Sequence, residues 1–317
     1  MNIAILDDYH GVAADYADWS ALGPQAKVQV FREALPEAER AAALQPFDVI
    51  VIMRERTPFP AALINALPNL RLLVTTGLRN NSIDMAACKA RGITVCGAPG
   101  AGDAVNATAE LAWTLILGLF KNLCTEDVTM RRGGWQTGMP LPLAGKRLGV
   151  LGLGKLGQAV ARVGKAFDMD VVAWSPNLTP ERAQEGGATY VSKQDLFATS
   201  DVISVHLILS DRSRNVVDAD CFKAMKSSAF LVNTSRAGLV DQDALMNALR
   251  HKRIAGAGLD VFDVEPLPAD DPVRHLDNVV LTPHLGYVNE DNFRAFYANA
   301  LAAIQAWVAG KPIRELG

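Results

Sequence analysis

Short apolar runs, often rich in β-branched residues, alternate along the chain with segments of helical periodicity. In the first third the runs are NIAIL, KVQVF, DVIVI, LRLLVTT and ITVCG, and the segments between them include PEAERAAAL, PFPAALINAL and SIDMAACKARG. A strand followed by a helix, repeated several times, is typical of a parallel sheet covered on both faces. The pattern therefore predicts an α/β unit that ends near residue 100.

A second alternating series begins after a break. The pattern predicts a long helix from about Ala104 to Leu123, then the Gly- and Pro-rich loop RRGGWQTGMPLPLAGK. From Arg147 the apolar runs are RLGVLGLG, DVVAWS, DVISVHL, AFLVNTS, IAGAGLDVF and VVLTPHLG, and a last helix lies in NEDNFRAFYANALAAIQAWVAG. Nearly continuous apolar runs indicate strands that are buried on both faces. The prediction is an α/β protein with two doubly wound parallel sheets.

Length and charge narrow the class of ligand. At 317 residues the chain exceeds the usual size of one core, which favours two domains. The formal net charge is −3 and the Lys and Arg residues are scattered, so there is no electrostatic pattern for nucleic acid or a membrane surface. We therefore expect a small-molecule ligand.

Other features bear on the compartment and on metals. The start, MNIAILDDYH, does not resemble a signal peptide, and the longest apolar stretch, residues 111–120, is too short to cross a bilayer. The 4 cysteines form no CxxC pair and no His/Cys metal spacing. We expect a cytoplasmic protein with reduced thiols and no metal site.

A glycine-rich turn follows the first strand of the second series. VLGLGKLG places Gly152, Gly154 and Gly157 in the G-x-G-x-x-G spacing, between an apolar strand and a helix. The first glycine permits a tight turn, the second lets a pyrophosphate approach the backbone, and the third lets helix and strand pack closely. The helix amino terminus adds free N–H groups and partial positive charge. The turn predicts a dinucleotide site made of Gly152, Leu153, Gly154, Lys155, Leu156 and Gly157.

The end of the next strand bears on the choice of dinucleotide. An acidic residue there would bind the adenosine ribose, but DVVAWSPN has Ser175. Ser175 does not repel a 2′-phosphate, and no arginine follows at once to bind one, although Asn177 and Arg182 lie nearby in the chain. The sequence predicts NAD(H) or NADP(H), with Ser175 and Asn177 as contacts, and leaves the choice open.

Three strand ends of the second series carry Arg236, Glu265 and His284, in LVNTSRAG, LDVFDVEP and LTPHLG. Ligands of open parallel sheets bind at the carboxyl ends of the strands. Taken singly, the three residues are explained as a surface charge, a turn cap and a core histidine. Together they offer three complementary groups. The guanidinium of Arg236 can bind a carboxylate through two parallel hydrogen bonds, the imidazole of His284 can donate a proton, and the carboxylate of Glu265 can orient the imidazole and stabilise its charge. Reduction of a 2-oxo acid needs all three.

The motifs GLGKLG, NTSRAGLVD, AGAGLDVFDVEP and LTPHLGY, in this order, resemble those of the D-isomer-specific 2-hydroxyacid dehydrogenase family. The resemblance covers essentially the whole chain. It implies a Rossmann cofactor domain, residues 101–286, and a flavodoxin-like substrate or lid domain made from both chain ends, residues 1–100 and 287–317. It also implies a homodimer, because the apolar helix from Leu111 to Phe120 matches the family's usual interface and Trp135 resembles a loop tryptophan that approaches a neighbouring subunit.

The resemblance assigns roles to the three charged residues. Arg236 would bind the substrate carboxylate and polarise the 2-oxo group, His284 would be the general acid in reduction and the base in oxidation, and Glu265 would pair with His284.

It also assigns residues around the nicotinamide. Asp260 would hold the carboxamide, and Thr234 and Gly286 would line the ring. The family's proline after the His-Leu pair is replaced by Ile208, and His206 is interpreted as part of the wall on the cofactor side.

The family's lid loop supplies backbone N–H groups to the substrate carboxylate. Here the loop is TTGLRNNSID, with Thr76 and Gly77 in the matching place. It departs from the family's G-x-D-x-x-D pattern, because Arg79 and two extra residues occupy the turn. We hypothesise that Arg79 adds positive charge near the substrate, with a solvent-facing arginine as an equal alternative. For Arg54 and Arg56, a salt-bridged surface role is favoured over substrate contact.

The predicted function is hydride transfer between a nicotinamide cofactor and a small 2-oxo or D-2-hydroxy acid, with glyoxylate or hydroxypyruvate preferred. One alternative is a nicotinamide-sensing regulator or corepressor on the same scaffold, against which the complete Arg/Glu/His set argues. Another is a phosphoglycerate dehydrogenase-type enzyme, against which the short end after AWVAGKPIRELG argues. Formate dehydrogenase is disfavoured, since its family pattern has Gln where Glu265 stands.

Overall fold

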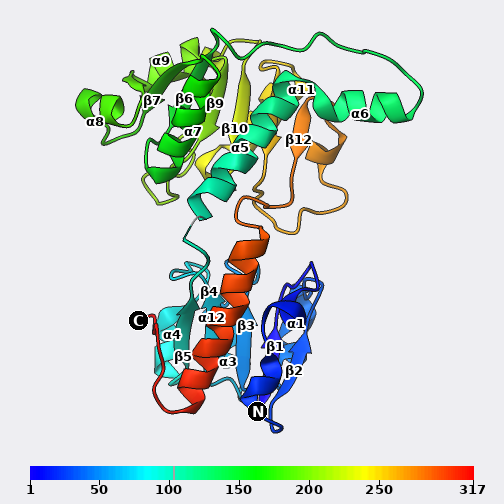
Figure 1. The fold of residues 1–317 in the computed structure, drawn as a ribbon, viewed down its shortest axis with the longest axis vertical. Helices are drawn as coiled ribbons and strands as arrows, with labels where there is room; N and C mark the ends of the chain where they lie inside the picture. Colours follow the sequence, from blue (N-terminus) through cyan, green and yellow to red (C-terminus); the bar gives the residue numbers. More distant parts are fainter. Residues whose placement is uncertain (103) are drawn as a thin grey trace. The chain divides into compact units, whose positions relative to one another are not determined.

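The computed structural model describes residues 1–102 and 104–317. The chain divides into two compact units (Figure 1). Unit 1 comprises Met1–Gly102 and Asn289–Gly317, and unit 2 comprises Asp103–Val288. Each unit is built around its own parallel sheet.

Unit 1 contains a five-stranded parallel sheet in the order β2-β1-β3-β4-β5. Its strands are β1 (Asn2–Ile5), β2 (Lys27–Val30), β3 (Val49–Ile52), β4 (Leu72–Thr76) and β5 (Thr94–Ala98). Its helices are α1 (Ala13–Tyr16), η1 (Trp19–Leu22), α2 (Glu37–Leu44), α3 (Ala61–Asn65), α4 (Met85–Ala90) and α12 (Glu290–Val308). Every residue of the inner strand β3 is buried, whereas the edge strand β2 is partly exposed along its length.

The C-terminal helix α12 belongs to the core of unit 1. It packs on β4 and β5, and its Phe296, Ala300 and Ile304 are buried (Figure 1). The buried Tyr297 hydroxyl donates to Asp8 Oδ1 at 3.2 Å, so the helix is tied by a polar contact to the loop after β1.

Unit 2 contains a seven-stranded sheet in the order β12-β11-β10-β9-β6-β7-β8, and all its strand pairs are parallel. The strands are β6 (Arg147–Leu151), β7 (Asp170–Trp174), β8 (Thr189–Tyr190), β9 (Val202–Val205), β10 (Phe230–Asn233), β11 (Gly256–Leu259) and β12 (Val279–Leu281). The order reverses between β6 and β9, which is where open α/β sheets bind ligands. The two parallel sheets confirm the predicted α/β class.

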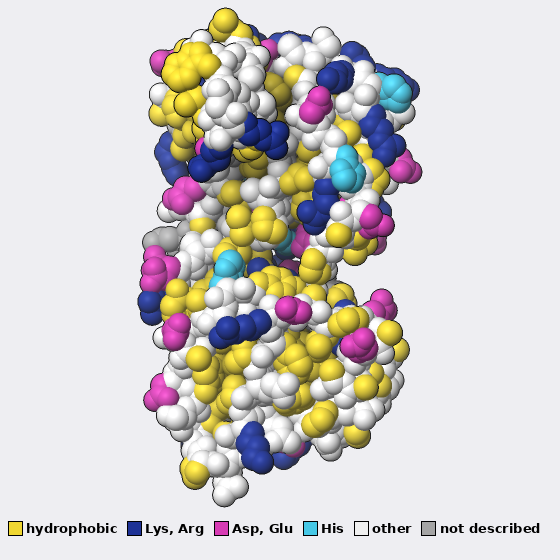
Figure 2. Space-filling model, turned by 90° about the vertical axis from the view of Figure 1, so that its right-hand side faces the viewer, with side chains coloured by type: hydrophobic (Ala, Val, Ile, Leu, Met, Phe, Trp, Pro, Cys, Tyr) yellow, Lys and Arg dark blue, Asp and Glu magenta, His cyan; other side chains and the backbone are white. Residues whose placement is uncertain are grey.

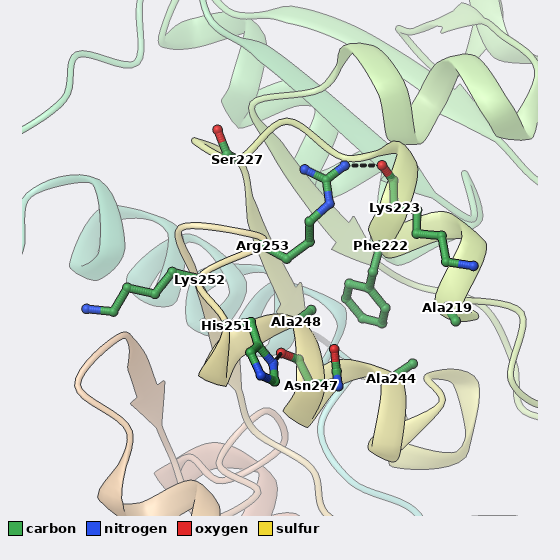
Figure 3. Close-up of a pocket in the computed structure, with 10 residues that line it drawn as sticks. All are labelled: Ala219, Phe222, Lys223, Ser227, Ala244, Asn247, Ala248, His251, Lys252 and Arg253. Atoms are coloured by element: carbon green, nitrogen blue, oxygen red, sulfur yellow. Dashed lines mark hydrogen bonds between the residues drawn. The ribbon is translucent and has the colours of Figure 1, made fainter.

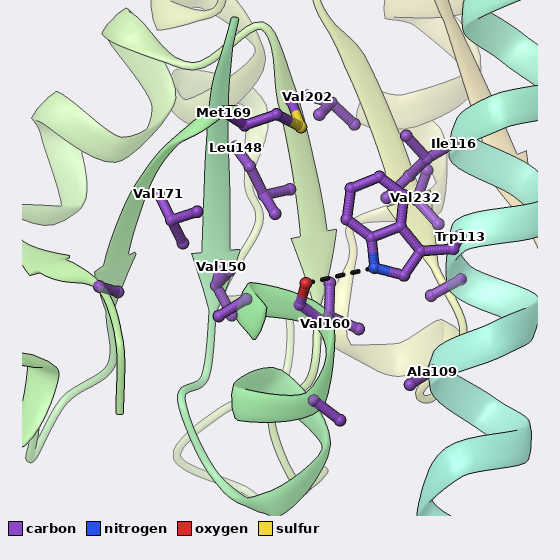
Figure 4. Close-up of a cluster of buried hydrophobic side chains, with 14 of the residues drawn as sticks. Ala109, Trp113, Ile116, Leu148, Val150, Val160, Met169, Val171, Val202 and Val232 are labelled. Carbon is purple, nitrogen blue, oxygen red and sulfur yellow. Dashed lines mark hydrogen bonds between the residues drawn. The ribbon is translucent and has the colours of Figure 1, made fainter. Parts of the chain in front are cut away.

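Helices cover both faces of this sheet. The helices of unit 2 are α5 (Ala104–Phe120), α6 (Leu123–Arg131), α7 (Lys155–Ala166), α8 (Pro180–Glu185), α9 (Lys193–Thr199), α10 (Ala219–Ala224), η2 (Ala237–Leu239), α11 (Gln242–Arg250) and η3 (Pro272–His275). One hydrophobic cluster joins α5 and α7 to the strands, and a second joins α9, α10 and α11 to the other face. In the first cluster Trp113 and Ile116 of α5 face the sheet, and Trp113 Nε1 donates to the Val160 carbonyl at 3.2 Å (Figure 4).

The segment after α5 differs from the sequence prediction. The long helix ends at Phe120, and Asn122, in the left-handed region at φ 53°, separates it from α6, which the sequence analysis did not predict. None of the α6 residues is buried, and Leu123 is 60% exposed. Its mixed polar and apolar sequence lacks the periodic apolar face that marks a helix packed on a core, which explains the omission. The short edge strand β8 was also missed.

The surface carries charges of both signs. Acidic and basic side chains are interspersed over the face of each unit shown in Figure 2. Across residues 1–102 and 104–317, no helix has the length and apolar character needed to cross a membrane.

Candidate active site

The glycine turn of unit 2 lies between β6 and α7. Gly152 has φ +101°, a value that side chains rarely adopt, and its N–H donates to the Trp174 carbonyl at 2.9 Å. An added Cβ on Gly152 would lie 2.8 Å from the His206 carbonyl carbon at the end of β9. The turn therefore runs directly against the neighbouring strand end, and only glycine fits its first position.

The other two glycines differ in the space around them. A Cβ on Gly157 would lie 2.1 Å from the Gly152 carbonyl oxygen, so this glycine is required for packing within the turn. A Cβ on Gly154 would have no neighbour within 4 Å. Gly154 precedes the first residue of α7 and leaves open space at the amino terminus of that helix. The turn thus has the room and the free N–H groups that a dinucleotide pyrophosphate requires.

Two buried polar atoms near the same strand ends have no hydrogen-bond partner among the described residues. They are His206 Nδ1, just after β9, and Thr234 Oγ1, just after β10. Buried polar atoms are normally paired, so these atoms fit the contact surface of a bound polar ligand. Together with the open Gly154, they make the edge of this sheet a good fit for a nicotinamide dinucleotide.

His206 is electrically neutral in this environment. Burial lowers the pKa of its imidazole from 6.5 to about 4. Its Nε2 lies 2.7 Å from the Ser204 hydroxyl, which fixes the ring. The residue therefore acts as an uncharged hydrogen-bonding group, which suits a wall of the cofactor site.

Ser175 and Asn177 lie in the turn after β7. The Leu178 N–H donates to the Ser175 carbonyl at 3.1 Å, and Arg182 Nη1 donates to the Asn177 carbonyl at 3.0 Å. The guanidinium of Arg182 is thus held beside the turn in which an adenosine ribose or 2′-phosphate would be recognised.

Arg236, Glu265 and His284 follow three adjacent strands, β10, β11 and β12. Neighbouring strands lie about 4.8 Å apart, so the carboxyl ends of these three meet at one edge of the sheet. The structure brings Glu265 and His284 into direct contact, with Oε2 of Glu265 2.6 Å from Nδ1 of His284. Because Nδ1 is engaged, Nε2 is the ring nitrogen left for proton exchange.

The electrostatics of Glu265 favour its ionised form. Burial alone opposes the charge, but the hydrogen bond and charge of His284, the Phe262 N–H at 2.9 Å from Oε1, and the Arg236 charge outweigh it. The pKa of Glu265 accordingly lies below its ordinary value. The acid is therefore a carboxylate at neutral pH, as an orienting partner of a histidine must be.

Arg236 is held by its own turn. Asn233 Nδ2 donates to the Arg236 carbonyl at 3.0 Å, and Asn233 Oδ1 accepts from the Ser235 N–H at 3.0 Å. The guanidinium donates to the Ser235 carbonyl at 2.7 Å and lies close enough to Glu265 to lower the pKa of that acid. The partly buried side chain thus stands at the strand edge that carries the His–Glu pair.

Asp260 supports the loop that carries His284. Its carboxylate is fully buried and accepts from the Thr282 hydroxyl at 2.6 Å, the Leu285 N–H at 2.7 Å and the Gly286 N–H at 2.9 Å. His284 itself has a left-handed backbone, φ 54°, which needs support from its neighbours. The sequence resemblance gave Asp260 a cofactor role and did not reveal this bracing role.

Tyr287 is a further neighbour of His284 that the sequence analysis did not single out. The two rings meet edge to face, with centroids 5.3 Å apart and an interplanar angle of 81°. Its place at the end of the motif LTPHLGY was the available signal.

In unit 1, Thr76 and Gly77 lie at the end of β4. The Gly77 N–H donates to the Ala98 carbonyl at 2.6 Å, and Thr76 Oγ1 accepts from the Arg54 N–H at 2.8 Å. The expectation that Gly77 presents its N–H to a substrate therefore differs from the structure, because an antiparallel bridge to Ala98 already uses that group.

Arg54 lies against the same turn. A Cβ on Gly77 would lie 1.9 Å from Arg54 Nη1, so the absence of a side chain at Gly77 makes room for the guanidinium. Asn80 fastens the loop by donating to the Arg54 carbonyl at 2.7 Å and to the Thr75 hydroxyl at 2.9 Å. Arg79 is exposed. Within the described residues, the one ion pair of the Arg54 guanidinium is a long contact to Glu55, 3.8 Å, which is a weak basis for the salt-bridged surface role.

Arg56 has a different environment. Its Nη1 donates to the Asp7 carbonyl at 2.9 Å, and its guanidinium lies 4.6 Å from the centre of the Tyr9 ring. These contacts favour a structural role after β3.

As for metals, the described part of the chain holds no group of three or more His, Cys, Asp or Glu side chains placed to bind an ion.

Comparison with known proteins adds an independent line of evidence. A sequence model of the family described as "D-isomer specific 2-hydroxyacid dehydrogenase, NAD binding domain" matches residues 113–286. The chain is 37% identical over 258 residues to the glyoxylate reductase of Aeropyrum pernix, covering 78% of this chain and 76% of that protein. It is 34% identical over 287 residues to the D-3-phosphoglycerate dehydrogenase of Archaeoglobus fulgidus, covering 90% of this chain and 53% of that protein. The chain thus spans about half the length of this second relative.

A solved structure agrees over the whole fold. The phosphoglycerate oxidoreductase of Vibrio cholerae superposes with a TM-score of 0.91 at 35% identity, covering 98% of this chain and 99% of that chain.

Proposed function

Because the chain belongs to the D-isomer specific 2-hydroxyacid dehydrogenase family, a family of NAD(P)-dependent oxidoreductases, we propose that it transfers a hydride between nicotinamide and a small 2-oxo acid. The predicted family is confirmed. The observation that carries the proposal is the 2.6 Å contact between His284 Nδ1 and Glu265 Oε2 on the strand edge that also bears Arg236.

Each of the three residues has a separate task in the proposed reaction. A bound nicotinamide supplies the hydride in the direction of reduction. Arg236 binds the substrate carboxylate with its planar fork and stabilises negative charge that develops on the 2-oxygen. His284 donates a proton from Nε2 to that oxygen, while Glu265 holds the ring through Nδ1 and stabilises the imidazolium. In the direction of oxidation, His284 accepts the proton.

The cofactor is proposed to be NAD(H) or NADP(H), bound along the turn Gly152–Gly157. Support comes from the open Gly154 position and from the buried unpaired atoms of His206 and Thr234 among the described residues. Ser175 and Asn177 would meet the adenosine ribose, and Gly286 would lie by the nicotinamide. Asp260 would accept from the carboxamide in addition to its three present donors.

Glyoxylate or hydroxypyruvate is the proposed substrate, supported by similarity to a glyoxylate reductase. A phosphoglycerate dehydrogenase-type reaction is the second candidate, because the Archaeoglobus fulgidus relative carries that name. In unit 1, Thr76, Gly77 and Arg79, at and after the end of β4, are proposed as substrate contacts, Gly77 through groups other than its N–H. Arg54, in the loop after β3, lies against the same turn.

The direct test is a comparison of initial rates. The purified chain is supplied with glyoxylate, hydroxypyruvate, pyruvate or 3-phosphohydroxypyruvate, each with NADH and NADPH in parallel, and loss of reduced nicotinamide is followed by absorbance. Turnover of one of the two short 2-oxo acids supports the proposal, and preference for the phosphorylated acid supports the second candidate. Silence across the panel, with cofactor bound, would indicate a regulator.

His284→Ala tests the assigned proton donor. Turnover should fall roughly 10²-fold or more, the scale for loss of a positioned general acid, while the cofactor still binds. Full activity with an unaltered pH profile would show that another group transfers the proton.

A homodimer is also proposed. Most apolar residues of α5, including Ala112, Leu115 and Ile116, are used by the core of unit 2, so the helix offers less interface than expected. Exposed apolar side chains on and after α6 are better candidates: Leu123, Val128, Met130, Trp135 and Met139. Sedimentation of the parent chain and of Met130→Glu would test whether this segment joins two copies.

A further inference from the structure

A cavity of about 440 Å³ lies between α10 and α11 in unit 2, outside the proposed active site (Figure 3). Its apolar part consists of Phe222 and three alanines, Ala219, Ala244 and Ala248. Small residues on the two helices leave the space, and Phe222, a buried core residue, also lines it. The volume is in the range of small-molecule sites, which run from roughly 300 to 1,000 Å³.

The cavity lies at the opposite edge of the sheet from Arg236 and Glu265. Two of its polar residues, Lys223 and Asn247, lie on the helices. The others lie in the loops that lead from α10 and α11 into the first residues of β10 and β11: Ser227, His251, Lys252 and Arg253. The catalytic residues follow the other ends of the same strands. A strand of four residues rises roughly 13 Å. The two sites are therefore separated by at least the length of these strands.

The polar lining is basic. The ten described lining residues include four basic side chains, Lys223, His251, Lys252 and Arg253. None of these ten residues is Asp or Glu. One N–H of Arg253 donates to the Lys223 carbonyl, so it links the loop after α11 to α10 (Figure 3). A guanidinium has five N–H donors, so the same side chain retains donors for a ligand.

The two lysines have partners that a ligand can replace. Lys223 pairs with Asp220 at 2.9 Å and Lys252 with Asp277 at 3.5 Å, and all four side chains are more than two-thirds exposed. Exposed pairs of this kind contribute little stability. The two lysine side chains extend outward on opposite sides of the cavity (Figure 3), so each amine would have to turn inward to reach an anion held by Arg253.

From these observations we propose that the α10–α11 cavity is a second ligand site, for a small organic anion with an apolar body. The apolar part would lie against Ala219 and Ala244, the more exposed apolar residues of the lining, and the anionic group would bind Arg253 and be flanked by Lys223 and Lys252. Basic residues at helix carboxyl ends also stabilise the helix dipole, and the experiment must separate that role from binding.

The test uses phenyl phosphate, an aromatic ring with a dianionic group, and measures binding by calorimetry with NAD⁺ present at saturation. Arg253→Gln should weaken binding about tenfold, the scale of one charge-assisted hydrogen bond. Arg250→Gln is the matched control, because Arg250 ends the same helix α11, is exposed and does not line the cavity; its affinity should equal that of the parent.

Ala219→Phe provides a second variant that leaves every charge in place. Ala219 is exposed at the start of α10, so the larger ring should fill the cavity from its rim without disturbing the core, and binding should be lost. No saturable binding to the parent, equal weakening by Arg253→Gln and Arg250→Gln, or unchanged affinity in Ala219→Phe would each overturn the proposal. None of these measurements depends on turnover.

Discussion

The contact between Glu265 and His284 leads to a specific expectation for Glu265→Gln. Both oxygens of Glu265 accept hydrogen bonds, Oε2 from His284 Nδ1 at 2.6 Å and Oε1 from the Phe262 N–H at 2.9 Å. A glutamine keeps the size but has only one acceptor oxygen. In one orientation of the amide, its NH₂ group faces the Phe262 N–H, and two donors oppose each other. In the other orientation the NH₂ group faces His284 Nδ1, which then cannot carry a proton, so the imidazolium form is disfavoured.

The magnitude follows from the strength of the lost bond. A hydrogen bond to a charged group contributes about 1.5 to 3 kcal/mol, and about 1.4 kcal/mol corresponds to tenfold in rate. We therefore expect turnover to fall about 10- to 100-fold, with the affinity for cofactor unchanged. Initial rates of nicotinamide oxidation at saturating substrate measure the first quantity, and calorimetry measures the second.

Two comparisons make the result decisive. Glu185→Gln makes the same chemical change at an exposed position of α8 in the same unit and should leave turnover unchanged. In a His284→Ala background, Glu265→Gln should add no further loss, because Glu265 acts through the imidazole. Turnover of Glu265→Gln equal to that of the parent, or full additivity in the double variant, would refute the orienting role.

Three further outcomes are expected. Gly154→Val should keep the parent's melting temperature, because a Cβ there meets nothing within 4 Å, but should weaken cofactor binding at least about tenfold; Gly157→Ala, whose Cβ would lie 2.1 Å from the Gly152 oxygen, should instead lower the melting temperature. Burial lowers the pKa of His206 from 6.5 to about 4, so the unfolded state binds the proton first as the pH falls. The free energy of unfolding should therefore decrease by about 3 kcal/mol between these two pH values. In His206→Gln, the plot of unfolding free energy against pH should lack this decrease. Asp260→Asn should turn a buried acceptor into a donor facing the Gly286 or Leu285 N–H and cost about 1 to 3 kcal/mol of stability, measured by urea denaturation.

Much of the fold was predictable because the inner strands of both sheets are buried on two faces. Runs such as DVIVI and AFLVNTS contain few polar residues, so they are readily predicted as buried strands. They correspond to β3 and β10, respectively. The helix α6 was not predictable in this way. Its residues are all at least partly exposed, so no apolar periodicity reports its presence, and the left-handed Asn122 that begins it has no unique sequence signal.

The residues of the proposed site could be predicted from the sequence, but their contacts could not. The sequence placed Arg236, Glu265 and His284 after consecutive strands, but it gave no sign that Gly77 gives its N–H to Ala98 or that Arg54 fills the space over that glycine. Such contacts arise between segments that are separate in sequence, and they depend on side-chain and loop geometry that spacing does not encode.

The order of the strands explains why residues so far apart in the chain can act on one ligand. β10, β11 and β12 are neighbours in register, with Asn233 beside Leu259 and Leu259 beside Leu281, so their following loops begin at one level. Asp260 then fixes the third loop to the end of the second strand through Thr282, Leu285 and Gly286. His284 is held between these bonds and the Glu265 carboxylate. The imidazole is therefore positioned from both sides by the residues after β11, and a shift of that strand by one residue would turn Asp260 away from the loop and remove the support of the proposed proton donor.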